Sequence, residues 1–132
     1  MKTRTLNFIV IAAIPILMTG CSKQISYNKD IKPILSSSCL MCHSGSGEGY
    51  VKSGFSVENY NTIMKGTKLG PVIVPGNSLS STLFRLVSHN TDPKIQMPPH
   101  HDESLADGKL KPLSRAQVET IALWIDQGAK NN

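Results

Sequence analysis

The chain has 132 residues, a formal net charge of +5 at pH 7 and an aromatic content of only 5%. This length corresponds to one small domain with a single core. No stretch of the sequence interleaves basic with aromatic residues, so we expect no nucleic acid among its partners.

The first twenty-one residues have the pattern of an export signal. Met1–Arg4 is basic, Leu6–Met18 is mostly apolar, and small residues precede Cys21. The apolar run is shorter than the roughly 20 residues that span a bilayer, so we expect cleavage rather than retention. The tetrad Met18–Cys21 resembles a bacterial lipobox, with Met18 where Leu is more common. The resemblance implies a signal peptide over residues 1–20 and a diacylated Cys21; a soluble secreted form is the alternative.

Removal of residues 1–20 leaves 112 of the 132 residues and takes away Lys2 and Arg4, which lowers the formal charge from +5 to +3. We expect residues 21–26 to form a short lipid-anchored tether and residues 27–132 to form the domain. Residues 22–26 reach less than roughly 20 Å, which keeps the domain close to the membrane. The expected location is the periplasmic side of the bacterial cell envelope. Ser22, in place of Asp, resembles the pattern that sorts enteric lipoproteins to the outer membrane.

The first predicted helix runs from about Asn28 to Ser38. Its apolar residues, Ile31, Ile34 and Leu35, have helical spacing. Either Asn28 or Asp30 is suited to cap its first turn. Pro33 fits best within the first turns, where its missing N–H has no helical partner.

The run Cys39-Leu40-Met41-Cys42-His43 follows that helix directly. Such a Cys-x-x-Cys-His motif is a site of covalent haem attachment through two thioethers, with the histidine as the proximal iron ligand. A thioredoxin-like redox pair and half of a zinc site are the alternatives. No βαβ pattern surrounds the motif, and the rest of the chain does not supply the further thiols or the paired His motif that a zinc site would need. The third cysteine, Cys21, is expected to carry lipid. We therefore predict one haem c, which would also supply apolar mass to a core that is poor in aromatic residues.

The middle of the chain alternates loops with short helices. Ser44–Gly54, rich in glycine and serine, is predicted to be an irregular loop. A helix carrying Val57, Ile63 and Met64 is expected to stop at Gly66. After an extended segment over residues 71–76, Ser78 is suited to cap a helix that ends near residues 89–90 and carries Leu79, Leu83, Leu86 and Val87.

The last helix has the clearest pattern in the chain. Ser114 and Gln117 form a capping box, and Gly128 lies beyond the helix end. One apolar face between them carries Val118, Ile121, Ala122 and Ile125. Trp124 flanks that face, and we expect it to be a core residue rather than a partner contact.

The residue that fills the sixth position of the iron decides between electron transfer and an open site. Met97 precedes Pro98-Pro99, so the backbone there is extended and stiff and can hold a thioether against iron. Met97 is therefore the predicted distal ligand. Three kinds of alternative stay open. The ligand could be Met64, which has the position of a core residue, or a histidine at a polar or helix-end position, His89, His100 or His101, or the sixth position could be unfilled.

An ordered set of motifs runs through the chain from about Tyr27 to Ala129: Asp30–Ile34, Cys39–His43, Val74–Gly76, Ser80, Phe84, Met97–Pro99 and Trp124–Ala129. Taken together, these motifs resemble the monohaem cytochrome c domain of the planctomycete type. The resemblance implies an all-α cytochrome c fold wrapped around one haem, with His43 proximal and Met97 distal. Gly54-Phe55, where Gly-Leu is more common, and a long polar loop from Pro99 depart from the pattern.

The expected function is that of a membrane-anchored electron carrier without an independent catalytic site. Ligation by methionine and histidine raises the reduction potential of haem, which suits exchange with other redox proteins such as cytochromes, an oxidase, a peroxidase or a dehydrogenase. The alternatives are a haem-based sensor or enzyme subunit with a displaceable distal ligand, and a structural subunit whose haem serves assembly.

Overall fold

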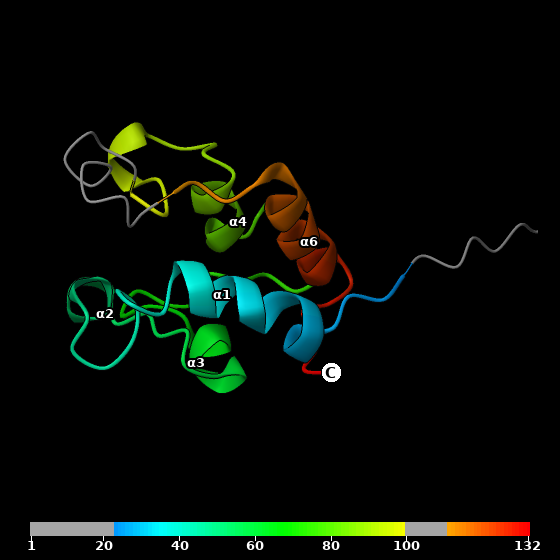
Figure 1. The fold of residues 1–132 in the computed structure, drawn as a ribbon, viewed down its shortest axis with the longest axis horizontal. Coiled ribbons are helices and arrows are strands. Elements are labelled where there is room, and N and C mark those ends of the chain that lie inside the picture. Colours follow the sequence, from blue (N-terminus) through cyan, green and yellow to red (C-terminus); the bar gives the residue numbers. More distant parts are fainter. Residues whose placement is uncertain (1–22, 100–110) are drawn as a thin grey trace, which may run out of the picture.

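The computed structural model describes residues 23–99 and 111–132. Cys21 and the predicted signal peptide lie outside these residues, as do His100 and His101. The described ranges are helical and hold one isolated bridge but no strand, which confirms the predicted all-α class (Figure 1). None of their helices is both long and apolar enough to cross a membrane. In chain order the elements are η1 (Tyr27–Ile31), α1 (Lys32–Ser38), α2 (Glu48–Ser53), α3 (Tyr60–Lys65), α4 (Thr82–Val87), η2 (Pro93–Ile95) and α6 (Arg115–Asp126).

The first helical segment is continuous from η1, a π-helical turn, into α1. Its cap is Ser26, so the expectation that Asn28 or Asp30 fills this position was wrong. The Ser26 hydroxyl accepts a hydrogen bond from the Lys29 amide at 3.3 Å, and the Asp30 carboxylate accepts one from the Ser26 amide at 2.8 Å. The two side chains thus satisfy backbone donors reciprocally at the helix start. Pro33 falls in the first turn of α1, as predicted.

Helix α2 corrects the prediction of an irregular loop over residues 44–54. The segment folds back on the haem motif, and the Tyr50 amide donates to the Cys42 carbonyl at 2.9 Å. A Cβ atom at Gly47 would lie 2.5 Å from that same carbonyl oxygen. The glycines therefore serve a close approach between two backbone segments rather than an open loop. Gly54 ends the helix in a left-handed conformation with φ of 74°.

Helix α3 begins at a capping box formed by Asn59 and Thr62 and stops at Gly66, as predicted. Val57 precedes the helix but is buried beside it, and Ile63 is completely buried. Met64 is partly buried and packs against the core.

Helix α4 starts later than predicted, at Thr82 rather than after Ser78. Ser78 instead binds the carboxylate of Asp126 through its amide at 2.7 Å and its hydroxyl at 3.0 Å. The hydroxyl of Ser81 donates to the Asn77 carbonyl at 2.8 Å. These side-chain hydrogen bonds stabilise a turn in place of a first helical turn, which leaves Leu79 largely exposed.

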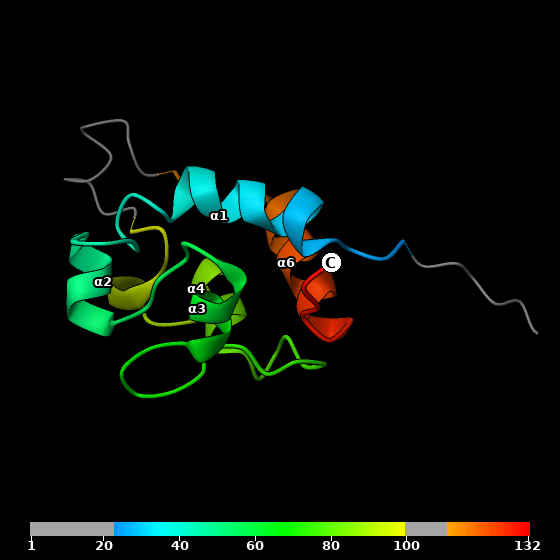
Figure 2. The same cartoon turned by 90° about the horizontal axis from the view of Figure 1, so that it is seen from below.

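Helix α6 closes the core, and its Ser114–Gln117 capping box is confirmed. Trp124 is completely buried, as predicted, and its indole N–H donates to the Lys130 carbonyl at 2.9 Å. The ring of Tyr27 lies 5.9 Å from that of Trp124 and 5.3 Å from that of Tyr60, so η1, α3 and α6 meet in one aromatic cluster. The Lys23 end of the described chain and the C-terminus lie at one end of the molecule, and α2 lies at the other (Figures 1 and 2).

Candidate functional site

The Cys-x-x-Cys-His motif turns directly out of α1. The Cys39 amide still donates to Leu35, and the His43 amide donates to the Cys39 carbonyl at 2.9 Å, so the helical winding continues through the motif. Cys39 and Cys42 form no disulfide. Burial raises the pKa of the Cys39 thiol to about 11, with a smaller contribution from Cys42. The group is therefore a neutral thiol at neutral pH and not the reactive thiolate of a redox pair.

His43 is oriented by a backbone acceptor. Its Nδ1 atom lies 3.2 Å from the carbonyl oxygen of Phe55, and the rings of the two residues meet edge to face at 5.4 Å. Burial lowers the pKa of His43, and the hydrogen bond to Phe55 only partly offsets this. The imidazole is therefore neutral near pH 7, with Nε2 as the nitrogen that remains to bind a metal.

Gly49 of α2 leaves space around that nitrogen. A Cβ atom at this position would lie 2.9 Å from His43 Nε2 and 2.7 Å from Cε1. Real Cβ atoms essentially never make contacts this short. The absence of a side chain at position 49 thus keeps Nε2 of His43 accessible.

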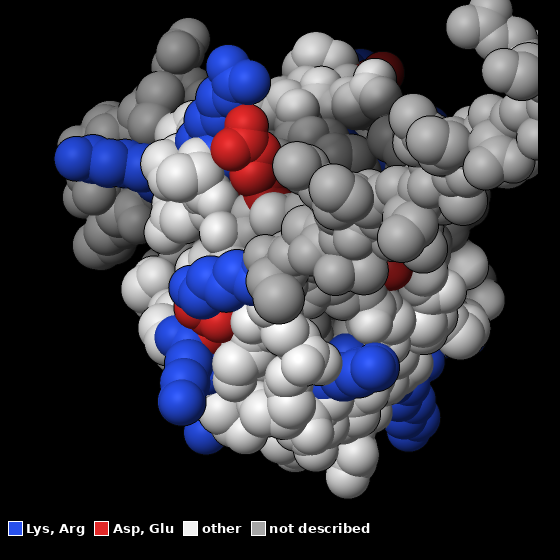
Figure 3. Space-filling model, turned by 90° about the vertical axis from the view of Figure 1, so that its right-hand side faces the viewer, with Lys and Arg blue, Asp and Glu red and all other residues white. Residues whose placement is uncertain are grey.

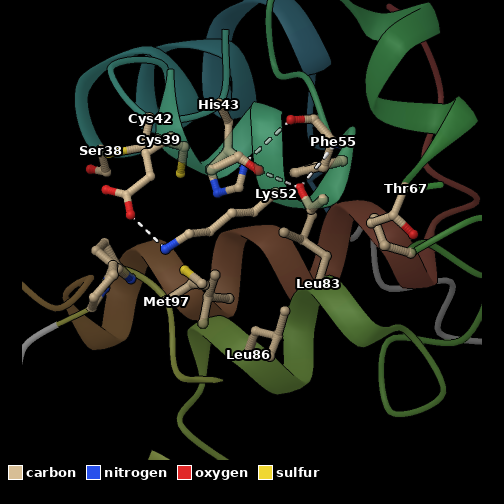
Figure 4. A pocket seen from close by; sticks show the side chains of 17 residues that line it. Ser38, Cys39, Cys42, His43, Lys52, Phe55, Thr67, Leu83, Leu86 and Met97 are labelled. Atoms are coloured by element: carbon tan, nitrogen blue, oxygen red, sulfur yellow. Dashed lines mark hydrogen bonds and ion pairs between the residues drawn. The ribbon is translucent and has the colours of Figure 1, made fainter. Parts of the chain in front are cut away.

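A cavity of about 280 Å³ lies beside the motif, lined by Cys39, Cys42 and His43 and by Met97 from the opposite wall (Figure 4). Its remaining wall is mostly apolar. An apolar cavity with two thiols, a neutral imidazole and a thioether presents the donor set of a covalently held haem, so these residues fit that group. The apolar lining includes Phe55, Val72, Leu83, Leu86, Val87 and Pro98.

Met97 is held by its own backbone and its neighbour. Its amide donates to the Leu86 carbonyl of α4 at 3.1 Å. The preceding Gln96 side chain donates to the His89 and Thr91 carbonyls, each at 3.2 Å. Pro98 and Pro99 then continue the segment along the cavity wall. We call Gln96–Pro99 the methionine strap.

The structure separates Met97 from two of the alternatives. Neither Met64 nor His89 is among the residues that line the cavity. His89 lies just beyond α4, with a φ of 59°. His100 and His101 lie outside the described residues, so their candidacy is untested.

Sequence reasoning missed one polar pair of the site. Lys52 and Glu48 both line the cavity and are joined by an ion pair. Figure 4 shows Lys52 beside Met97. Their i, i+4 spacing is a helical signal that could have revealed both the pair and α2. The glycines on either side outweighed it in the prediction.

The described residues contain no group of three or more His, Cys, Asp or Glu side chains placed to hold a metal ion. A haem pocket requires no such group, because the porphyrin supplies most of the iron ligands. The fold and the cavity together therefore point to the class of c-type cytochromes.

Comparison with known proteins agrees with this class. Residues 39–101 match the family model described as Planctomycete cytochrome C. The match begins at the first motif cysteine and ends just beyond the methionine strap. The match supports a cytochrome c domain of the planctomycete type in this part of the chain and suggests a haem-binding, electron-transferring protein. No curated protein and no solved structure gives a significant match.

Proposed function

We propose that the protein is a membrane-anchored electron carrier that holds one haem c. Cys39 and Cys42 would form the two thioethers, His43 would bind the iron from one side and Met97 from the other. The observation that supports this assignment is the placement of His43 and Met97 on opposite walls of the cavity that both cysteines line (Figure 4).

Haem bound in this way supplies one-electron exchange between ferrous and ferric iron. The residues of the chain supply orientation and surroundings. The Phe55 carbonyl holds His43 in the tautomer that presents Nε2. The methionine strap holds a soft thioether, which favours ferrous iron and raises the potential. The apolar part of the lining would lower the polarity around the haem, which is one way in which the protein sets the reduction potential.

Two protein ligands on the iron leave no position for a substrate, so we assign no independent catalytic activity. The partners proposed are other redox proteins that exchange single electrons. Cys21 is proposed as the diacylated first residue of the mature chain, which places the domain on the periplasmic side of the cell envelope. The position of Cys21 after an apolar, signal-like run supports this part of the proposal.

The methionine strap also supports a second candidate, a haem-based sensor or enzyme subunit with a displaceable Met97. The strap lies outside any helix, and the Met97 side chain is only partly buried. A ferric spectrum distinguishes the two candidates, because methionine ligation gives a weak sulfur-to-iron band in the far red. The carrier should show this band and should not bind carbon monoxide when reduced. A missing band, or a Soret shift with carbon monoxide in the wild-type protein, would favour the sensor.

A further inference from the structure

The end of the molecule where the described chain begins carries a group of exposed lysines. Lys23 precedes η1, Lys29 lies in it and Lys32 begins α1, while Lys130 comes from the C-terminal segment that packs beside them. We call these four residues the lysine face. Figure 3 looks onto this end and shows more Lys and Arg than Asp and Glu side chains there.

Acidic side chains only partly neutralise this face. Asp30 lies 3.5 Å from the Lys23 ammonium and also accepts a hydrogen bond from the Ser26 amide. That backbone hydrogen bond, with the lysines at positions 23 and 29, lowers the pKa of Asp30. With Asp30 counted against the four lysines, an excess of three positive charges remains among these side chains.

Hydrogen bonds join the start of the domain to its C-terminal segment. The Ile25 amide donates to the Gln127 side chain at 2.7 Å, and that side chain donates back to the Lys23 carbonyl at 3.0 Å. The Tyr27 amide donates to the Asn132 side chain at 2.9 Å. Ile25 itself is buried. The chain is therefore already fixed to the domain at Lys23 and Ile25.

Only a few residues separate this fixed point from the proposed anchor. From Cys21 to Ile25 the extended chain reaches about 14 Å. A lipid on Cys21 would thus bring the lysine face within reach of the bilayer, but the tether alone would not fix the tilt of the domain. The elements that line the haem cavity include α2, which lies at the opposite end of the long axis, and α4, which lies nearer its middle (Figures 1 and 2).

We propose that the lysine face rests on the anionic phospholipid headgroups of the bilayer that holds the anchor, so that the haem cavity lies at the end away from the membrane. This inference rests on the lipid anchor of the proposed function. Its consequence is that redox partners approach from the aqueous side and not through the bilayer. Each lysine close to an anionic surface strengthens the contact by about fivefold, and salt weakens it.

The test uses the full-length holoprotein on supported bilayers, with the tilt of the haem plane measured by polarised absorption. On phosphatidylglycerol mixed with phosphatidylcholine, we expect one defined tilt in the wild-type protein. It should become random on phosphatidylcholine alone and in high salt. The Lys29→Gln/Lys32→Gln/Lys130→Gln variant should lose it on the anionic bilayer. The matched control, Lys68→Gln/Arg85→Gln/Lys94→Gln, removes three charges elsewhere and should keep it.

The same tilt on neutral and anionic bilayers, or an unchanged tilt in the Lys29/Lys32/Lys130 variant, would overturn the proposal and leave the face to an acidic protein partner. Failure of the anchor has a different signature: an unacylated N-terminus by mass spectrometry and no retention on neutral bilayers. If the anchor is absent, binding of the holoprotein to phosphatidylglycerol vesicles still tests whether the lysine face binds anionic headgroups. Salt-sensitive binding, at least about tenfold weaker in the Lys29/Lys32/Lys130 variant, would support it. Equal vesicle binding by the Lys29/Lys32/Lys130 variant and the Lys68/Arg85/Lys94 control variant would refute the proposed contact.

Discussion

The Nδ1 atom of His43 and the carbonyl oxygen of Phe55 lie 3.2 Å apart, although twelve positions separate the residues in the chain. The segment between them holds α2, and the cap residue Gly47 and the helical Gly49 lie close against the motif. This segment thus brings the Phe55 carbonyl to His43 Nδ1 and leaves Nε2 accessible. The orientation of His43 therefore depends on the 44–55 segment as well as on the motif.

The first prediction concerns Gly49. In an ordinary helix, Gly49→Ala would stabilise the protein by up to about 1 kcal/mol. Here the new Cβ would lie 2.7 Å from His43 Cε1, so we expect a displaced imidazole, a lower haem content and an altered Soret band. Haem content is measured by pyridine haemochrome. Ser46→Ala, at an exposed position before α2, is the control and should retain full haem content. A fully loaded, more stable Gly49→Ala protein would contradict the assigned role.

The second prediction concerns haem attachment. Cys39→Ala and Cys42→Ala each remove one thioether, so part or all of the haem should become extractable by acid acetone. His43→Ala removes the proximal ligand and should prevent accumulation of stable holoprotein. The measurement is the haem that stays with the polypeptide on a denaturing gel. Complete covalent retention in Cys42→Ala would contradict the attachment site.

The third prediction contrasts two tyrosines of the aromatic cluster. The Tyr27 hydroxyl is buried and has no hydrogen-bond partner within the described residues, whereas the Tyr60 hydroxyl donates to the Ala129 carbonyl at 2.8 Å. Tyr27→Phe should leave the free energy of unfolding unchanged or raise it by about 1 kcal/mol. Tyr60→Phe should lower it by about 1 kcal/mol. Urea denaturation of the two holoproteins measures the difference, and a reversed order would refute the hydrogen-bond assignment.

Sequence patterns predicted correctly those helix ends that are determined by residues a few positions apart. The Ser114–Gln117 capping box and the stop at Gly66 each depend on residues within a few positions, and both are present. Helix α2 was missed because glycine content favours a loop locally, while the close approach of Gly47 to Cys42 is tertiary. The late start of α4 has the same origin, since the Asp126 carboxylate that binds Ser78 lies 48 positions away.

Parts of the candidate site were also predictable from local sequence, and parts depend on tertiary packing. Cys39, Cys42 and His43 are adjacent in the sequence, so their grouping was evident from the motif. That Met97 rather than Met64 faces the same cavity depends on how the methionine strap packs against α4. Nothing local to either methionine specifies this packing. The proline pair after Met97 only indicated a stiff, extended backbone that could hold a ligand.

The fourth prediction concerns the tether. Cys21→Ser removes the thiol that a lipoprotein signal requires, so the protein should move from the membrane fraction to a soluble or uncleaved form. Labelled palmitate should enter the wild-type protein but not the variant. Ser22→Ala, next to the cysteine, is the control and should leave labelling intact. Unchanged fractionation together with an unlabelled wild-type protein would show that no lipid anchor forms.

The last prediction tests Met97 as the distal ligand. Met97→Ala would remove a soft thioether that favours ferrous iron, so the reduction potential should fall, while the thioethers and His43 should still hold the haem. The freed position should then bind carbon monoxide or azide readily.

Met64→Ala is the matched control, because Met64 packs against the core but does not line the cavity. It should lower the free energy of unfolding by about 2 kcal/mol or more and leave the ligand spectrum unchanged. Equal carbon monoxide binding by the wild-type and Met97→Ala proteins would count against the carrier. Loss of the sulfur-to-iron band in Met64→Ala alone would move the ligand to Met64.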